Sequence, residues 1–163
     1  MNPLFRAVSI GMMMVVFHVA GVNAQEPQKK DPCSLLSKAE IQAEVKQTVG
    51  DGHVKSGANP AVGAPCQYKI GGYGVFSILL KSAGPGETAD TVKAELNKRK
   101  VPISDLPGLG EHSFFSSPGY GMIQLNTFKG SDYLIITMML PGANEKAQKT
   151  AAQNLMRKAL ANL

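Results

Sequence analysis

Catalytic and metal-binding residue patterns are scarce in this sequence. Its 163 residues include two cysteines and three histidines, with no H-E-x-x-H, no C-x-x-C and no G-x-S-x-G motif. The carboxylates occur without a D-x-D pair, and Gly108-Leu-Gly110 lacks the helix start and lysine of a phosphate-binding loop. Glu111 and His112 are neighbours at a predicted strand start, where their side chains diverge. We therefore expect no enzymatic activity.

Metal and cofactor ligands are also few. Beyond residue 24 the chain has two histidines, His53 and His112, and four methionines, which are Met122, Met138, Met139 and Met156. Histidine and methionine can hold copper or haem. However, Met138 and Met139 are adjacent in a predicted strand and must point to opposite faces, and Met156 lies on the apolar face of a predicted helix. We expect core packing, with no metal and no cofactor.

The chain has only one compact basic run, Lys98-Arg99-Lys100. It falls at the end of a predicted helix, where cations complement the helix dipole. No interleaved aromatic residues accompany it, as a groove for single-stranded nucleic acid would require. We expect no nucleic-acid partner. The formal charge of +5 is typical of an ordinary surface and is also compatible with an anionic envelope surface.

Residues 1–24 have the pattern of a secretory signal peptide. Arg6 gives a basic start, residues 7–20 are apolar, and Val22-Asn23-Ala24 fits a small-residue cleavage site. The apolar run is short for a membrane span, so retention as an anchor is the alternative. Position 25 is glutamine, so lipidation at the cleavage site is not available. The sequence predicts a periplasmic or secreted protein without an integral span after cleavage.

Removing this segment leaves a polar tether over residues 25–31, predicted to be disordered, and a single domain over residues 32–163. The domain opens with a helix signal, because Ser37 and Glu40 have capping-box spacing and Leu36 and Ile41 form a hydrophobic staple. Val45 and Val49 continue the apolar stripe from Ile41, and Gly50 is the expected end of the helix.

Cys33 precedes this helix and Cys66 begins a predicted strand. Two cysteines in an exported chain most often pair. Closing a loop of about 34 residues stabilises a fold by roughly 3.5–4 kcal/mol in the chain-entropy model. We expect a structural disulfide, with a redox or metal-binding pair as the alternative.

The rest of the chain predicts an α+β fold. Strands are expected near residues 53–55, 67–70 and 75–80, a helix capped by Thr88, strands at 122–128 and 133–140, and a C-terminal helix from Asn144. Gly72-Tyr-Gly and Gly119-Tyr-Gly each open an apolar strand in the same register. We therefore expect an antiparallel sheet backed by helices, with a possible α-β-β-β duplication followed by the C-terminal helix.

Three short motifs carry a resemblance: Pro32-Cys-Ser-Leu-Leu-Ser-Lys-Ala-Glu40, the return at Cys66-Gln-Tyr68, and Leu106-Pro-Gly-Leu-Gly-Glu-His112. They resemble a group of small exported bacterial proteins, many of them lipoproteins and most of unknown function. The resemblance implies a bacterial envelope protein with a helix-backed antiparallel sheet, one disulfide and no catalytic residue. The chain differs from the lipoprotein members because it lacks a cysteine at the cleavage site.

Function is expected at the tips of turns. Tyr73 and Tyr120 lie at matching Gly-flanked tips, where they could form a shared aromatic patch that meets a partner. The alternative is that each ring folds back over the sheet edge. His112 is a third candidate for partner binding. Two classes stay open, namely an accessory domain that binds another envelope component and a protein inhibitor of an extracellular or cell-wall enzyme. An inhibitor would use residues 52–64 or 116–121.

Overall fold

The computed structural model describes residues 30–55 and 63–163. Its elements are the 3-10 turn η1 (Pro32–Ser34), α1 (Lys38–Val45), β1 (His53–Val54), β2 (Cys66–Ile70), β3 (Gly74–Ser82), α2 (Ala89–Lys98), β4 (Ile103–Asp105), β5 (His112–Gly119), β6 (Met122–Lys129), β7 (Asp132–Met139) and α3 (Glu145–Ala161). The predicted signal peptide and most of the predicted tether lie outside the described residues.

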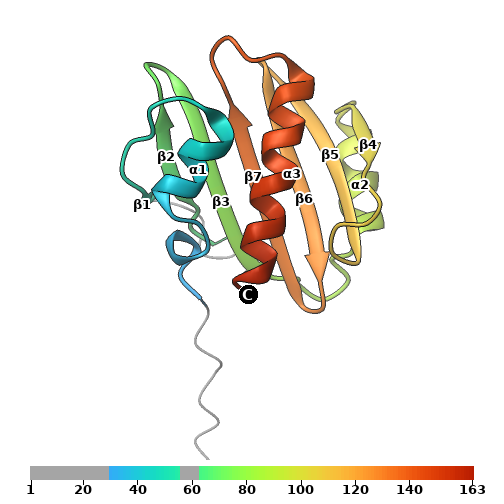
Figure 1. Ribbon diagram of the computed structural model, residues 1–163. Coiled ribbons are helices and arrows are strands. Elements are labelled where there is room, and N and C mark those ends of the chain that lie inside the picture. The colour runs from blue at the N-terminus through green and yellow to red at the C-terminus, as the bar shows by residue number, and fades with distance from the viewer. Residues whose placement is uncertain (1–29, 56–62) are drawn as a thin grey trace, which may run out of the picture.

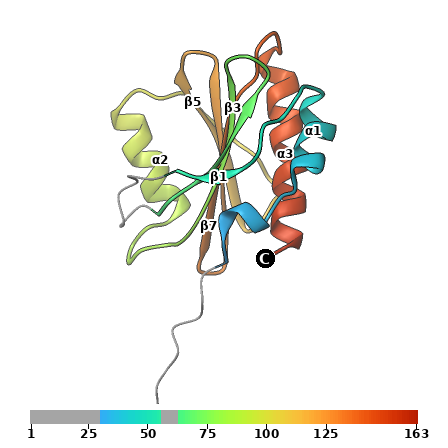
Figure 2. The ribbon, with the colours of Figure 1, turned by 90° about the vertical axis from the view of Figure 1, so that its left-hand side faces the viewer.

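The strands form one antiparallel sheet in the order β1-β2-β3-β7-β6-β5-β4 (Figure 1). Helices α1 and α3 cover one face, here called the α3 face, and α2 covers part of the other, the α2 face (Figure 2). The α+β prediction with a C-terminal helix is confirmed.

The main core lies between the sheet and the helices α1 and α3. Alternation along β3 directs Phe76, Ile78 and Leu80 into this core, while Leu79 is buried on the α2 face. A smaller core under α2 contains Phe114, Phe128 and Tyr133, with the last two rings stacked at 4.1 Å between centroids. Strand β3 therefore has buried residues on both faces of the sheet.

The predicted α1 start is confirmed, but its predicted end is wrong. The Ser37 hydroxyl accepts from the Glu40 N–H, and the Glu40 carboxylate accepts from the Ser37 N–H at 2.8 Å. The helix stops at Val45 because Lys46 adopts a left-handed conformation with φ of 55°. Val49, expected on the helix, instead forms a β-bridge with Ile70.

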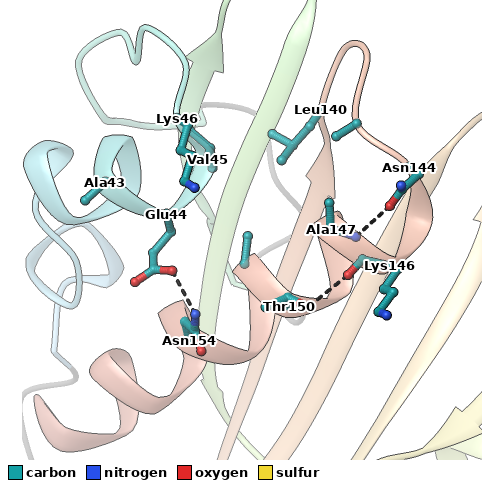
Figure 3. Close-up of a pocket in the computed structure, with 12 residues that line it drawn as sticks. Ala43, Glu44, Val45, Lys46, Leu140, Asn144, Lys146, Ala147, Thr150 and Asn154 are labelled. Carbon is teal, nitrogen blue, oxygen red and sulfur yellow. Dashed lines mark hydrogen bonds between the residues drawn. The ribbon is translucent and has the colours of Figure 1, made fainter.

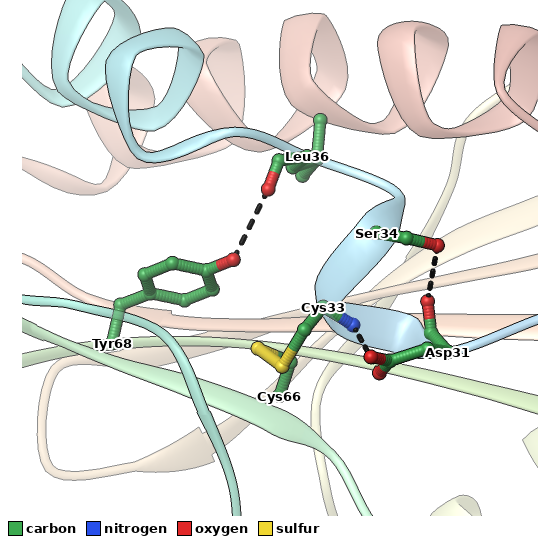
Figure 4. Close-up of a disulfide and its surroundings, with 6 residues drawn as sticks. All are labelled: Asp31, Cys33, Ser34, Leu36, Cys66 and Tyr68. Atoms are coloured by element: carbon green, nitrogen blue, oxygen red, sulfur yellow. Dashed lines mark hydrogen bonds between the residues drawn. A yellow bond between two sulfur atoms is a disulfide. The ribbon is translucent and has the colours of Figure 1, made fainter.

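The predicted disulfide between Cys33 and Cys66 is present and joins η1 to β2 (Figure 4). Beside it, the buried Tyr68 hydroxyl donates to the Leu36 carbonyl at 3.1 Å. Burial raises the Tyr68 pKa, and the nearby Asp31 carboxylate adds to the shift. Lys30, placed in the predicted disordered tether, donates through Nζ to the carbonyls of the last two residues. The end of the tether is thus part of the folded domain.

The outline α-β-β-β occurs twice, as α1-β1-β2-β3 and α2-β4-β5-β6, with β7 between the two groups of strands. The short β4 strand was not predicted. Phe76 and Ile123, matched in the sequence repeat, both pair with Met138 of β7 and so share one face. Helices α1 and α2 lie on opposite faces (Figure 2). The matched strands therefore share one face, while the helices of their two units lie on different sides of the sheet.

Candidate binding surface at the turn end of the sheet

Both predicted tyrosines lie at one end of the sheet. Strands β3 and β6 are each antiparallel to β7, so they run in the same direction. The turns that precede them, β2–β3 and β5–β6, therefore share an end with the β7–α3 connection (Figure 1). We call this end the turn end.

Tyr120 is held in an unusual backbone conformation. Gly119 pairs with Met122, leaving a two-residue turn in which φ is 57° at Tyr120 and 70° at Gly121. Positive φ at both central residues is the type I′ pattern, which favours Asn-Gly. A bulky side chain in the left-handed region is a rare outlier. Tyr120 is nevertheless 96% exposed, so packing of its ring does not offset the backbone strain.

Tyr73 occupies a longer turn between the paired residues Ile70 and Gly74, and its side chain is 74% exposed. Neither ring folds back over the sheet. The two turns flank β7, and β3 and β6 are two strand spacings apart, about 10 Å. Both rings are largely exposed, and the stacked pairs among the described residues involve other rings, so the two tyrosines share an end of the sheet without stacking on each other. The shared patch is therefore two separate exposed rings.

His112 lies at the opposite end of the sheet. It begins β5 and pairs with Phe128, whereas β5 reaches the turn end at Gly119. The seven residue-to-residue steps from His112 to Gly119 span roughly 23 Å. His112 is exposed, but the structure does not bring it together with the tyrosines.

A strip of half-buried apolar side chains lies on the α2 face just below the tyrosine turns. Val75 on β3, Met139 on β7 and Met122 on β6 form this apolar strip, which lines a pocket of about 260 Å³. Met138 points the other way into the main core, as the adjacency argument predicted. The strip was not predicted, because it depends on which strands are neighbours.

A row of uncharged polar side chains crosses the strands next to the apolar strip. Paired positions place Gln67, Ser77, Thr137, Gln124 and Ser116 side by side on five strands. Within this polar row, Gln124 donates to the Thr137 hydroxyl at 3.2 Å and accepts from the Ser116 hydroxyl at 3.4 Å. The α2-face pocket therefore has an apolar side and a hydrogen-bonding side.

A larger groove of about 510 Å³ runs between α1 and α3 on the other face (Figure 3). Its carboxylate, Glu44, accepts from the Asn154 amide at 2.9 Å and from Lys158 Nζ at 2.9 Å. The Asn154 hydrogen bond, followed by the contribution of Lys158, lowers the Glu44 pKa. Glu44 is therefore an ionised group that ties the two helices together, which is a structural role.

No three histidine, cysteine, aspartate or glutamate side chains of residues 30–55 and 63–163 gather to hold a metal ion. Within the same ranges no helix has the length and apolar character needed to cross a membrane. The chain matches no protein-family model, no curated protein and no solved structure.

Proposed function

We propose that this protein is an exported, non-catalytic domain that binds another component of a bacterial envelope through the turn end of its sheet. One observation carries the proposal: Tyr120 is held in a strained conformation while its ring stays 96% exposed. Backbone strain that is not offset by packing of the side chain is typical of functional positions. Exposed tyrosines are also common anchors of protein interfaces.

The disulfide supports export, because such bonds form and persist in oxidising compartments. The signal-peptide pattern of residues 1–24 and the resemblance to small exported bacterial proteins point the same way. We propose that this protein is related to those exported proteins, on the basis of the three short motifs given above.

An inhibitor of an extracellular or cell-wall enzyme is the second candidate. The specific observation in its favour is the tight hairpin that presents Tyr120 at its tip, a shape able to enter an active site. The other expected inhibitory segment, residues 52–64, falls mostly outside the described residues. Inhibition of a cell-wall hydrolase, lost in Tyr120→Asn, would select this candidate.

The test compares capture of partners from an envelope extract of the native host. The bait is the domain from residue 25 onward with its disulfide intact, as wild type, Tyr73→Ala/Tyr120→Asn and His112→Ala. We expect a partner that is retained by the wild type and by His112→Ala and lost by the tyrosine double variant. Equal capture by all three proteins would contradict the proposal.

A further inference from the structure

We infer that the α2-face pocket, together with the two lysines beside it, binds an extended acidic segment of a polypeptide whose aliphatic side chains lie on the apolar strip. The inference rests on the proposed function, since it assigns the chemistry of the partner that the tyrosines meet. It adds a second contact surface, next to the turn end and distinct from the tyrosine tips.

Val75, Met139 and Met122 lie side by side on three adjacent strands, on a part of the α2 face where they remain half-buried. Methionine is flexible and polarisable, so it adapts to apolar groups of varied shape. The strip therefore offers a surface for aliphatic side chains.

The polar row runs parallel to the strip and lies two residues further along each strand, a separation of about 6.6 Å. Hydroxyl and amide groups both donate and accept hydrogen bonds. The Ser77 hydroxyl makes no hydrogen bond to another of the described residues. An extended peptide lying along the two rows can bond to the polar row through its backbone while its side chains reach the strip.

Lys55 lines the pocket and Lys69, directly opposite Val75, lies beside it on the same face. Both are exposed, and neither forms an ion pair with a carboxylate of the described residues. The part of the pocket lining that the structure describes contains no aspartate or glutamate. Because both cations lie at the β1–β2 side, the acidic residue of the segment belongs at that side and its aliphatic residues belong over β7 and β6.

The test is a selection of random dodecapeptides displayed on phage against the wild-type domain, followed by fluorescence anisotropy with a synthetic selected peptide. We expect enrichment of peptides that combine aspartate or glutamate with leucine, methionine or phenylalanine. Lys55→Gln/Lys69→Gln should weaken binding about tenfold, since two exposed ion pairs are removed. The matched control Lys129→Gln, at the far end of β6, should stay within about twofold.

Salt provides a second readout, because exposed charge pairs are screened at high ionic strength. Raising the salt to 1 M NaCl should weaken binding by the wild type about as much as the two lysine substitutions weaken it at low salt. The affinity of the double variant should change little with salt. Enrichment of basic or neutral peptides, or lack of any enrichment, would overturn the inference. Equal affinity of the wild type and the lysine double variant for the selected peptide would also overturn the inference. The proposed function is tested separately, because it fails only if the tyrosine double variant still captures the envelope partner.

Discussion

Replacing Tyr120 by asparagine should stabilise the protein. The residue has φ of 57° in a two-residue hairpin turn. The left-handed conformation costs an ordinary L-residue roughly 1–2 kcal/mol, and asparagine tolerates it far better. The ring is 96% exposed, so its removal loses little packing. We expect Tyr120→Asn to raise the free energy of unfolding by about 1 kcal/mol.

Urea and thermal unfolding followed by circular dichroism would measure this change. A gain of 1 kcal/mol corresponds to an increase of roughly 3–5 °C in the unfolding temperature and about 0.5 M in the urea midpoint. The matched control is Tyr73→Asn, because Tyr73 is also exposed but does not have positive φ. Its change should stay within about 0.5 kcal/mol.

The same variant separates stability from function. If Tyr120 is retained for binding, Tyr120→Asn should be more stable and bind its partner less well. A loss of stability in Tyr120→Asn would show that the ring contributes packing that outweighs the backbone strain. The backbone conformation of Tyr120 would then be no evidence for a binding role.

Three further predictions concern the fold. Reduction of the Cys33–Cys66 disulfide removes its loop constraint from the denatured chain and should lower the free energy of unfolding by up to about 3.8 kcal/mol. Urea unfolding with and without a phosphine reductant would measure this loss. Gly74→Ala should cost about 1–3 kcal/mol, because a Cβ there would lie 2.5 Å from the proline of the β7–α3 turn, whereas Gly72→Ala, with open space, should cost almost nothing. Because its contacts in the folded state lower the Glu44 pKa from the ordinary value of 4.5, ionised Glu44 stabilises the fold above about pH 4.5. This stabilisation is lost as the pH falls through the folded-state pKa, so Glu44→Gln should flatten the acid limb of the curve of stability against pH.

Each of these predictions has an outcome that contradicts it. A double Cys→Ala variant should be insensitive to the reductant, and a wild-type loss below about 1 kcal/mol would mean that the bond constrains the denatured chain very little. Equal effects of the two glycine variants would contradict the close packing at Gly74. Parallel acid limbs for wild type and Glu44→Gln would contradict the role of the Asn154 and Lys158 contacts.

The parts of the fold that depend on local sequence were predicted well. The Ser37–Glu40 spacing identified the start of α1, Asn144 identified the start of α3, and compartment chemistry identified the disulfide. The end of α1 was missed because lysine is not the usual residue of a left-handed cap, so Lys46 carried no stop signal. The β4 strand was missed because it has three residues and no clear alternation.

The binding surface could be predicted only in part. The Gly-Tyr-Gly pattern identified Tyr73 and Tyr120 as turn residues, but their shared end follows from β3 and β6 running in the same direction beside β7. The apolar strip and the polar row are products of strand order and register. Residues such as Val75, Met139 and Met122 are far apart in the chain, and no local pattern indicates that they are neighbours.

The most direct test of partner binding at the turn end is photo-crosslinking in the native host. A photoreactive phenylalanine analogue would replace Tyr120 in one strain and His112, about 23 Å away along β5, in another. We predict a crosslinked adduct with an envelope component from position 120 and none from position 112. An adduct from position 112 alone would contradict the account, because the partner would then meet the opposite end of the sheet.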